Sequence, residues 1–207
     1  MTKSTKIQIL DVAEALFAEQ GFNQTSMRAI TSGANVNLAS VNYHYGTKKN
    51  LIQAVFKRYF DVLMPHIETV LADLPLQTGR AGVVTLLNAL VPPMLSLNAI
   101  RPNGTATFVL LLGKGYNETQ GHLRRFIMGH YGVAVKQLLL EIHRRLPEVQ
   151  DEDLFWRLHF AMGAFVFSMS SSSALTQIAQ SDFNEDVDVV GVIEHLIPFV
   201  ATGIAGQ

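Results

Sequence analysis

The sequence predicts an all-α fold of about nine helices, in which a three-helix N-terminal domain is joined by one long helix to a larger helical domain. Apolar residues recur at helical spacing along most of the chain. Alternating runs of β-branched residues joined by Asn-Gly turns, which would indicate strands, are missing. Residues 25–50 have the pattern of two short helices that meet at a tight turn. We place the two domains at residues 1–56 and 57–207.

The first helix is expected over residues 4–20. Gly21 follows it, at the position where glycine commonly ends a helix because it adopts left-handed backbone angles without strain. The expected inward side of this helix consists of Ile7, Leu10, Ala13, Leu16 and Phe17.

A second, short helix begins after Thr25 or Ser26, because either hydroxyl can cap it. This helix stops at Ser32 and Gly33. Gly33 and Asn35 tolerate left-handed backbone angles, so the chain can turn sharply before the next helix. The stretch therefore predicts a helix-turn-helix unit, although a small apolar subdomain with a few solvated charges would show a similar pattern.

The third helix is expected over Leu38–Tyr43, with Asn37 as its cap. Its small or hydrogen-bonding side chains would let its N-terminal half approach the edges of DNA bases, with phosphate contacts beside it. We therefore interpret it as a recognition helix. The residues expected to contact DNA are Thr25, Ser26, Arg28, Asn37, Leu38, Ala39, Ser40, Asn42, Tyr43, His44 and Lys48.

A wider pattern supports this interpretation. Between Leu10 and Leu51 the chain resembles the N-terminal domain of TetR-family transcription regulators, and NLASVNYHYGTKKNLIQAVF is most similar to the fatty-acid-responsive regulators of the PsrA type. Asn35 and Asn37 replace the usual glycine and serine of the family, and both are acceptable at a turn and a cap. The resemblance rests on Leu10, Ala13, Phe17, Gly21, Phe22, Thr25, Ile30, Ala34, Val36, Tyr43, His44, Tyr45, Lys48 and Leu51.

From Thr47 an apolar pattern continues to Leu71, which predicts one long helix shared by both domains. Pro65 lies inside it, where the missing N–H predicts a kink. Residues 75–82 predict a loop. In TetR-like proteins this long helix moves the recognition helices apart when a ligand binds, and the resemblance implies the same coupling here.

The C-terminal domain is expected to contain only helices, over residues 82–98 with a break at Pro92 and Pro93, 106–114, 122–145, 151–179 and 187–203. Residues 81–100 and 158–181 have no formal charge and are long enough to span a membrane. The proline, asparagine, serine and glutamine residues inside them favour buried helices of a soluble bundle instead. We therefore expect no membrane partner.

The formal net charge of -1 conceals an asymmetry. Residues 1–60 contain seven Lys or Arg and three acids, a balance of +4, whereas residues 61–207 contain nine and fourteen, a balance of -5. A local basic region on a nearly neutral protein is typical of a DNA-binding module attached to another domain. Cysteine is absent, which excludes disulfides and thiolate catalysis, and the N-terminal residues are too polar for a signal peptide, so we expect a cytoplasmic protein.

A composition of 48% hydrophobic and 16% charged residues indicates that some apolar surface meets a partner. The family resemblance implies a homodimer in which the last two helices, residues 151–179 and 187–203, pair with those of a second copy. Two-fold symmetry would then place two recognition helices about 34–36 Å apart on a palindromic operator in double-stranded DNA. An ordinary intramolecular core is the alternative for these helices.

The charged residues of the central helices are basic, and residues 82–117 and 119–140 contain no acid. An apolar cavity with basic residues at its mouth fits an anionic amphiphile, such as a long-chain fatty acid or its coenzyme A thioester, better than a cationic drug. Solvated basic residues and plain core packing are the alternatives. The residues expected to bind this effector are Arg101, Phe108, Leu111, Leu112, Lys114, Arg124, Arg125, Phe126, Met128, Tyr131, Met162 and Phe165.

The sequence thus predicts a repressor that leaves its operator when a fatty acid or acyl-CoA binds. The seven histidines are scattered, with no His-Glu-x-x-His pattern, and Gly-x-Ser-x-Gly is absent, so we expect no catalytic activity, metal or cofactor. The alternatives are a TetR-type repressor that senses another apolar small molecule (a drug or metabolite), a helical acyl-binding enzyme, and a structural DNA-binding protein with little sequence preference.

Overall fold

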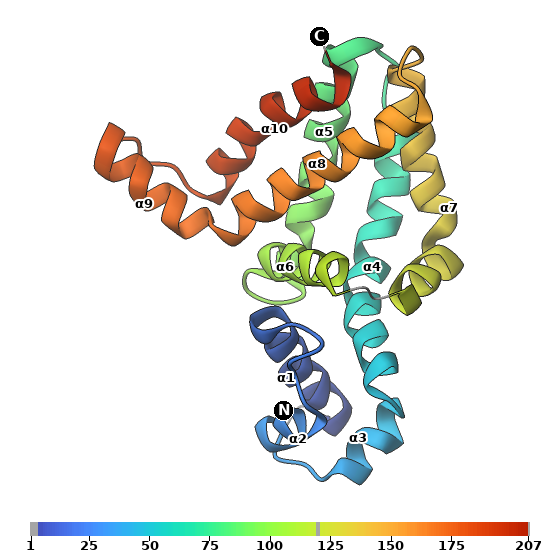
Figure 1. Ribbon diagram of the computed structural model, residues 1–207, viewed down its shortest axis with the longest axis vertical. Helices are drawn as coiled ribbons and strands as arrows, with labels where there is room; N and C mark the ends of the chain where they lie inside the picture. The colour runs from blue at the N-terminus through green and yellow to red at the C-terminus, as the bar shows by residue number, and fades with distance from the viewer. Residues whose placement is uncertain (1–3, 119–120, 207) are drawn as a thin grey trace.

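The computed structural model describes residues 4–118 and 121–206, and within them the chain forms ten α-helices and one 3₁₀ turn without any strand (Figure 1). The predicted all-α fold is therefore confirmed. The helices are α1 (Thr5–Gln20), α2 (Met27–Gly33), α3 (Leu38–Tyr45), α4 (Lys48–Asp73), α5 (Gly79–Ser96), η1 (Leu97–Ala99), α6 (Gly104–Asn117), α7 (Gly121–Arg145), α8 (Asp151–Ser170), α9 (Ser172–Phe183) and α10 (Val189–Ala205).

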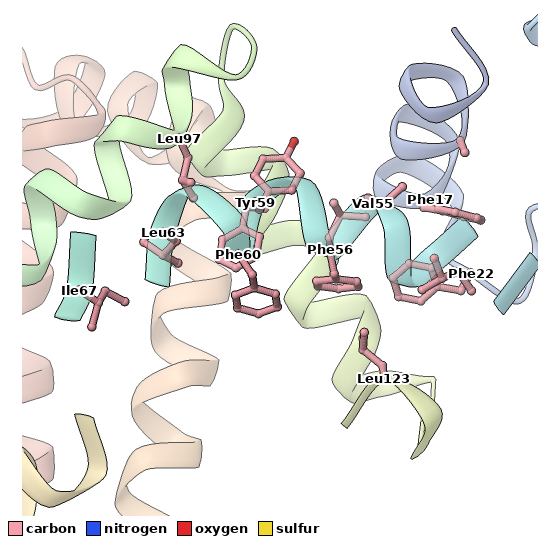
Figure 2. Packing of buried hydrophobic residues seen from close by; sticks show 14 of the residues in the cluster. Phe17, Phe22, Val55, Phe56, Tyr59, Phe60, Leu63, Ile67, Leu97 and Leu123 are labelled. Atoms are coloured by element: carbon pink, nitrogen blue, oxygen red, sulfur yellow. The ribbon is translucent and has the colours of Figure 1, made fainter. Parts of the chain in front are cut away.

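Helix α4 connects the two domains, because it packs against α1 and α3 at one end and against α5 and α7 at the other (Figure 1). It continues through Pro65 as one helix of 26 residues. Its inward residues, which include Phe56, Tyr59 and Phe60, form an aromatic core (Figure 2). The ring of Phe108 from α6 lies 5.3 Å from that of Phe60 and 5.2 Å from that of Tyr59. One core therefore extends from the N-terminal helices into the C-terminal domain.

Two expected boundaries around α5 are wrong. The helix begins at Gly79, inside the expected loop, and it runs through Pro92 and Pro93 without the expected break. Packing against α4, α7 and α10 explains why it holds despite two prolines, since tertiary contacts override a local penalty of this kind. Residues 79–99 are also the one single-helix stretch of the described chain long and apolar enough to cross a membrane, and here they pack against α4, α6, α7 and α10.

The expected single helix over residues 151–179 is wrong as well. The chain bends by 71° between α8 and α9, at Ser171. The hydroxyls of Ser170 and Ser172 donate hydrogen bonds to backbone carbonyls three residues earlier, and such bonds compete with the helical pattern. As a result α9 leaves the body of the protein while α8 and α10 pack on each other (Figure 1).

Helix α1 also differs from its predicted packing at one position. Ile9 is completely buried, whereas Ile7, expected on the inward side, is 46% exposed. Of the rest of the expected face, Ala13 and Phe17 are completely buried, and Leu10 and Leu16 are half-buried.

Candidate nucleic-acid interface

A side-chain cap fixes the start of each of the helices α2, α3 and α4. The Ser26 hydroxyl accepts a hydrogen bond from the amide of Ala29 at 3.0 Å, and Asn37 Oδ1 accepts one from the amide of Ser40 at 2.8 Å. Thr47 caps α4 in the same way. In the turn between α2 and α3, Asn35 has a positive φ of 49°, and asparagine tolerates this angle better than most residues. These local preferences set the angle between α2 and α3.

Helix α3, the predicted recognition helix, packs against α1 and α2. Ile30, Ala34 and Val41 are completely buried between these helices. The Tyr45 hydroxyl donates a hydrogen bond to the backbone carbonyl of Lys6 at 2.7 Å, and burial raises the pKa of Tyr45. The position of α3 relative to α1 is therefore determined by packing and by a directed hydrogen bond.

The outer face of α3 presents large side chains to solvent. Tyr43 is 86% exposed and Leu38 is 51% exposed, and Ala39 and Asn42 are exposed beside them. The predicted DNA contacts Leu38, Ala39, Asn42 and Tyr43 are therefore accessible from solvent. Ser40 is half-buried, and its hydroxyl donates to Asn37 Oδ1 at 3.0 Å, so both side chains serve the cap as well as the surface.

Three further predicted contact residues lie at the edges of this surface. Arg28 is exposed on α2, and the ring of His44 lies 5.0 Å from that of Tyr43. Lys48 is half-buried at the start of α4, with Nζ 3.5 Å from the backbone carbonyl of Asn23, and burial lowers its pKa. Arg28 and Lys48 thus lie on α2 and α4, and both of these helices pack against α3.

Thr25 requires a correction. It was expected at the DNA surface, but its side chain is completely buried and its hydroxyl donates a hydrogen bond to the backbone carbonyl of Gly21 at 2.7 Å. Thr25 therefore closes the turn between α1 and α2, and we remove it from the proposed DNA contacts. Ser26 is the helix cap.

Replacing Lys48 with alanine tests the flanking phosphate contact. If Lys48 neutralises one phosphate, the variant should bind all DNA sequences more weakly, and the slope of log K against log salt concentration should become less negative by about 0.9. Fluorescence anisotropy at four salt concentrations measures this slope. Lys57→Ala is the control, because Lys57 is paired with Asp61 at 2.6 Å farther along α4; an unchanged slope in Lys48→Ala would contradict the contact.

A buried carboxylate, which sequence reasoning missed, connects this domain to the next. Glu14 of α1 is completely buried and forms ion pairs with Arg58 of α4, at 2.8 Å, and with Arg101, which lies between η1 and α6. Arg58 also pairs with Asp11 at 2.7 Å. The hydrogen bond to Glu14 raises the pKa of Arg101. A signal was present in the sequence, because Glu14 falls between Leu10 and Phe17 on the inward stripe of α1.

A second connection lies at the other end of α6. Glu118, which follows the helix, accepts hydrogen bonds from the backbone amides of Phe22 at 2.9 Å and Asn23 at 2.5 Å. Gly21 makes this close approach possible, because a Cβ atom there would lie 2.1 Å from Glu118 Oε1. Helix α6 is thus tied to α1 and the turn after it at both of its ends.

Comparison with known proteins identifies the family. Residues 9–55 match the model of bacterial regulatory proteins of the tetR family, and residues 88–203 match that of the tetracyclin repressor-like C-terminal domain. The chain belongs to the TetR family. Among curated relatives, the probable HTH-type transcriptional regulator YttP of Bacillus subtilis is 29% identical over 87 residues, which is 42% of each chain. The similarity therefore spans less than half of that relative.

Solved TetR-like structures show the same fold over the whole chain. A putative tetR family transcription regulator from Shewanella sp. PV-4 has a TM-score of 0.62 at 15% identity, over 99% of this chain and 100% of the other. The fatty acid degradation regulator FadR from Bacillus halodurans has a TM-score of 0.60 at 15% identity, over 100% of both chains. At this identity the likeness concerns the fold.

In this TetR-family protein the predicted effector residues do not line one common cavity. Phe108 and Leu111 are completely or almost completely buried in the core, and the ring of Tyr131 lies 5.1 Å from that of Phe60. Leu112 and Phe126 pack against the same core, whereas Phe165 packs against a separate apolar cluster around Val109 and Ile193. Phe108, Leu111 and Tyr131 thus belong to the aromatic core around α4.

The basic residues expected to hold the effector head group are also separated. Arg101 forms an ion pair with Glu14. The aliphatic part of the Lys114 side chain faces α1, because a Cβ atom added at Gly21 would lie 3.5 Å from Lys114 Cδ. Arg124 and Arg125 are exposed in the first turn of α7, one turn before the 40% exposed Met128. Arg101 and Lys114 therefore serve the contact between domains.

An open groove of about 380 Å³ lies between α6 and α8. Gly113 allows the helices to approach closely, since a Cβ atom there would lie 2.7 Å from Val166 Cγ1. Met162 is the predicted effector residue that lines this groove, together with Gly113, Tyr116, His159, Gly163, Val166 and Phe167. Within the described residues, no group of three or more His, Asp or Glu side chains could hold a metal ion.

Proposed function

We propose that this TetR-family protein is a cytoplasmic, homodimeric repressor that binds a palindromic operator through α3 and is released by an apolar anionic effector, a fatty acid or acyl-CoA. The proposed DNA contacts are the exposed residues of α3 with Ser26, Arg28, Asn37, His44 and Lys48 at its margin. Helix α4 continues through residue 56 without interruption. The proposed division into residues 1–56 and 57–207 therefore separates two functions and does not mark a break in the chain's structure.

The attachment of α6 at both ends is the observation that supports regulation by a ligand. Arg101 ties the start of α6 to Glu14, and Glu118 ties its end to the amides of Phe22 and Asn23. A ligand that displaces α6 must therefore strain or break contacts to α1, and α1 holds the recognition helix from behind. Such a ligand shifts the population away from the DNA-bound arrangement because its affinity for the two arrangements differs.

The exposed face of α8 supports the dimer. Trp156 is 53% exposed, Phe160 is 69% exposed and Phe167 is 61% exposed, and all three lie on one side of the helix. The rings of Trp156 and Phe160 stack at 6.0 Å, and Phe199 of the adjacent α10 is 69% exposed. Aromatic residues are enriched in the cores of subunit interfaces, and an apolar face of this kind is unfavourable in water.

The groove between α6 and α8 is the place where an acyl chain would act on α6. Its volume falls in the range of about 300–1,000 Å³ that is common for small-molecule sites. Its lining is apolar apart from Tyr116 and His159, and it contains no carboxylate, which disfavours a cationic ligand. This choice of ligand matches the resemblance of the recognition region to PsrA-type regulators; another apolar drug or metabolite is the second candidate.

The effector is tested by fluorescence anisotropy on a DNA fragment from upstream of the gene, at one fixed salt concentration, with additions of a long-chain acyl-CoA and separately of the free acid. We expect release at stoichiometric ligand, and the ligand that releases the protein identifies the head group. If binding is tight and sequence-selective but neither ligand disturbs it, the proposal of a repressor stands and the proposal of an acyl effector is rejected. Turnover of the thioester would instead indicate an enzyme.

A groove-filling variant tests where the ligand acts. Met162→Trp places a larger side chain in the groove between α6 and α8. We expect unchanged operator affinity in the absence of ligand and at least a tenfold higher ligand concentration for release, a loss of about 1.4 kcal/mol. Met128→Trp on α7 is the matched control, because Met128 lies outside the groove. Equal responses of the two variants would place the ligand elsewhere.

A further inference from the structure

Helix α9 has no buried residue, although it is an ordered helix of 12 residues. It bends 71° away from α8 and stands out from the body of the protein, with packing against α8 and α10 near its ends (Figure 1). Isolated helices of this length are marginal in water, and most helical stability in proteins comes from packing of an apolar face. The helix therefore lacks the packing surface that its length requires.

The chemistry of α9 and the segment after it indicates what such a surface would look like. Ile178 is 52% exposed and Phe183 is 76% exposed. Asp182, Glu185, Asp186 and Asp188 follow within a short stretch, and no Lys or Arg occurs between residues 158 and 207. We refer to residues 172–188 as the arm. A surface that receives the arm should be apolar in its centre and positively charged around it.

The outer face of α7 has these properties. Val133 is 78% exposed and Leu140 is 59% exposed, and they lie on one side of the helix with Arg125, Lys136 and Arg144. We call these five residues the α7 outer face. Arg144 also pairs with Glu141 at 2.8 Å, and Glu141 is the one acid of α7 and is itself buried. The face therefore presents apolar groups with an excess of positive charge.

The arm cannot reach this face within one chain, because α9 and α7 lie on opposite sides of the molecule (Figure 1). We propose that the arm of one copy packs on the α7 outer face of a second copy. The charges of the two surfaces are complementary, and the arm directly continues α8 and leads into α10, which carry the exposed aromatic residues. This inference rests on the proposed homodimer, in which two-fold symmetry forms the contact twice.

Cysteine pairs test the contact directly, since the natural chain contains no cysteine and gives no background. The variant Ile178→Cys/Val133→Cys is treated with a mild oxidant or a short bis-maleimide and run on a non-reducing gel. We expect a covalent dimer as the main product. Neither single variant should give it, and neither should the matched pair Ile178→Cys/Gln8→Cys, in which Gln8 is exposed on α1.

Light scattering on the same samples separates the two levels of the inference. A dimeric protein in which Ile178→Cys cross-links with none of Val133→Cys, Lys136→Cys and Leu140→Cys would overturn the arm contact and leave the homodimer intact. A monomeric protein would overturn both. Dimerisation with cross-linking to Gln8→Cys at equal yield would also reject the contact, because it would show random collisions.

Charge reversal provides a second measurement that does not depend on the cross-linking register. Asp186→Lys and Lys136→Glu should each raise the Kd of the dimer, by roughly two- to thirtyfold, because the exposed ion pair occurs twice per dimer. The double variant should recover most of the wild-type Kd and its dependence on salt. Circular dichroism checks that each variant is folded. Additive losses without recovery in the double variant would contradict the pairing of these two surfaces.

Discussion

Replacing Glu14 with alanine is expected to lower the free energy of unfolding by about 3 kcal/mol. Removal of one partner from a buried ion pair costs about 3–5 kcal/mol, because the remaining charge loses its compensation. Here the remaining charges are Arg58, which keeps its ion pair with Asp11, and Arg101, and their side chains are 17% and 35% exposed. Partial access to water reduces their penalty, so the lower end of the range applies. The cavity left by the Glu14 side chain adds to the loss.

Urea denaturation followed by circular dichroism measures this change. Glu19→Ala is the matched control, since Glu19 is exposed on the same helix, and its effect should stay within about 0.5 kcal/mol. A double-mutant cycle of Glu14→Ala and Arg101→Ala then isolates the tie between α1 and α6. Equal stability of the Glu14 and Glu19 variants, or an interaction energy of zero between Glu14 and Arg101, would show that this cluster does not hold the two parts together.

The helices of the N-terminal domain could be predicted because their signals are local. The caps at Ser26, Asn37 and Thr47 and the left-handed turn at Asn35 depend on residues within three or four positions. Apolar periodicity likewise gave the buried side of α4, where Phe56, Tyr59 and Phe60 face the core (Figure 2). A sequence specifies features of this range without knowledge of the tertiary fold.

The contacts between the domains could not be predicted in the same way. Glu118 is bonded to amides that lie 95 and 96 residues earlier in the chain, and Arg101 is 87 residues from Glu14. The chain segments around Arg101 and Lys114 contain no acid, whereas in the folded protein α1 brings the carboxylate of Glu14 to Arg101. A basic residue in an apolar segment therefore indicated a ligand site where the structure places an ion pair.

The predicted effector residues are dispersed over several packing regions for a related reason. Phe108, Leu111 and Tyr131 were selected because they are large and apolar, but the same property lets them fill a core around α4. The groove between α6 and α8 depends on Gly113, which lets α6 approach Val166 of α8, and no sequence pattern states this contact. Shape at this level comes from the packing of helices, which is set by the whole chain.

Replacing Phe160 with aspartate is expected to convert the dimer to a monomer and to weaken operator binding by at least a hundredfold. Phe160 is 69% exposed in one copy, so the substitution has little effect on the fold of the subunit. In the proposed dimer the carboxylate would be buried without a partner in an aromatic interface, which is strongly unfavourable. Loss of the second recognition helix removes the gain from linked binding, which is about 10²–10⁴.

Light scattering measures the mass, and anisotropy on the operator measures the affinity at the same protein concentration. Leu76→Asp is the matched control, because Leu76 is 62% exposed and lies in the loop between α4 and α5, away from α8. The control should remain dimeric with wild-type affinity, whereas Phe160→Asp should bind half-sites only at high concentration and with half the salt slope. A Phe160→Asp protein that stays dimeric would move the interface away from α8, and a monomer with full operator affinity would show that a single α3 suffices for recognition.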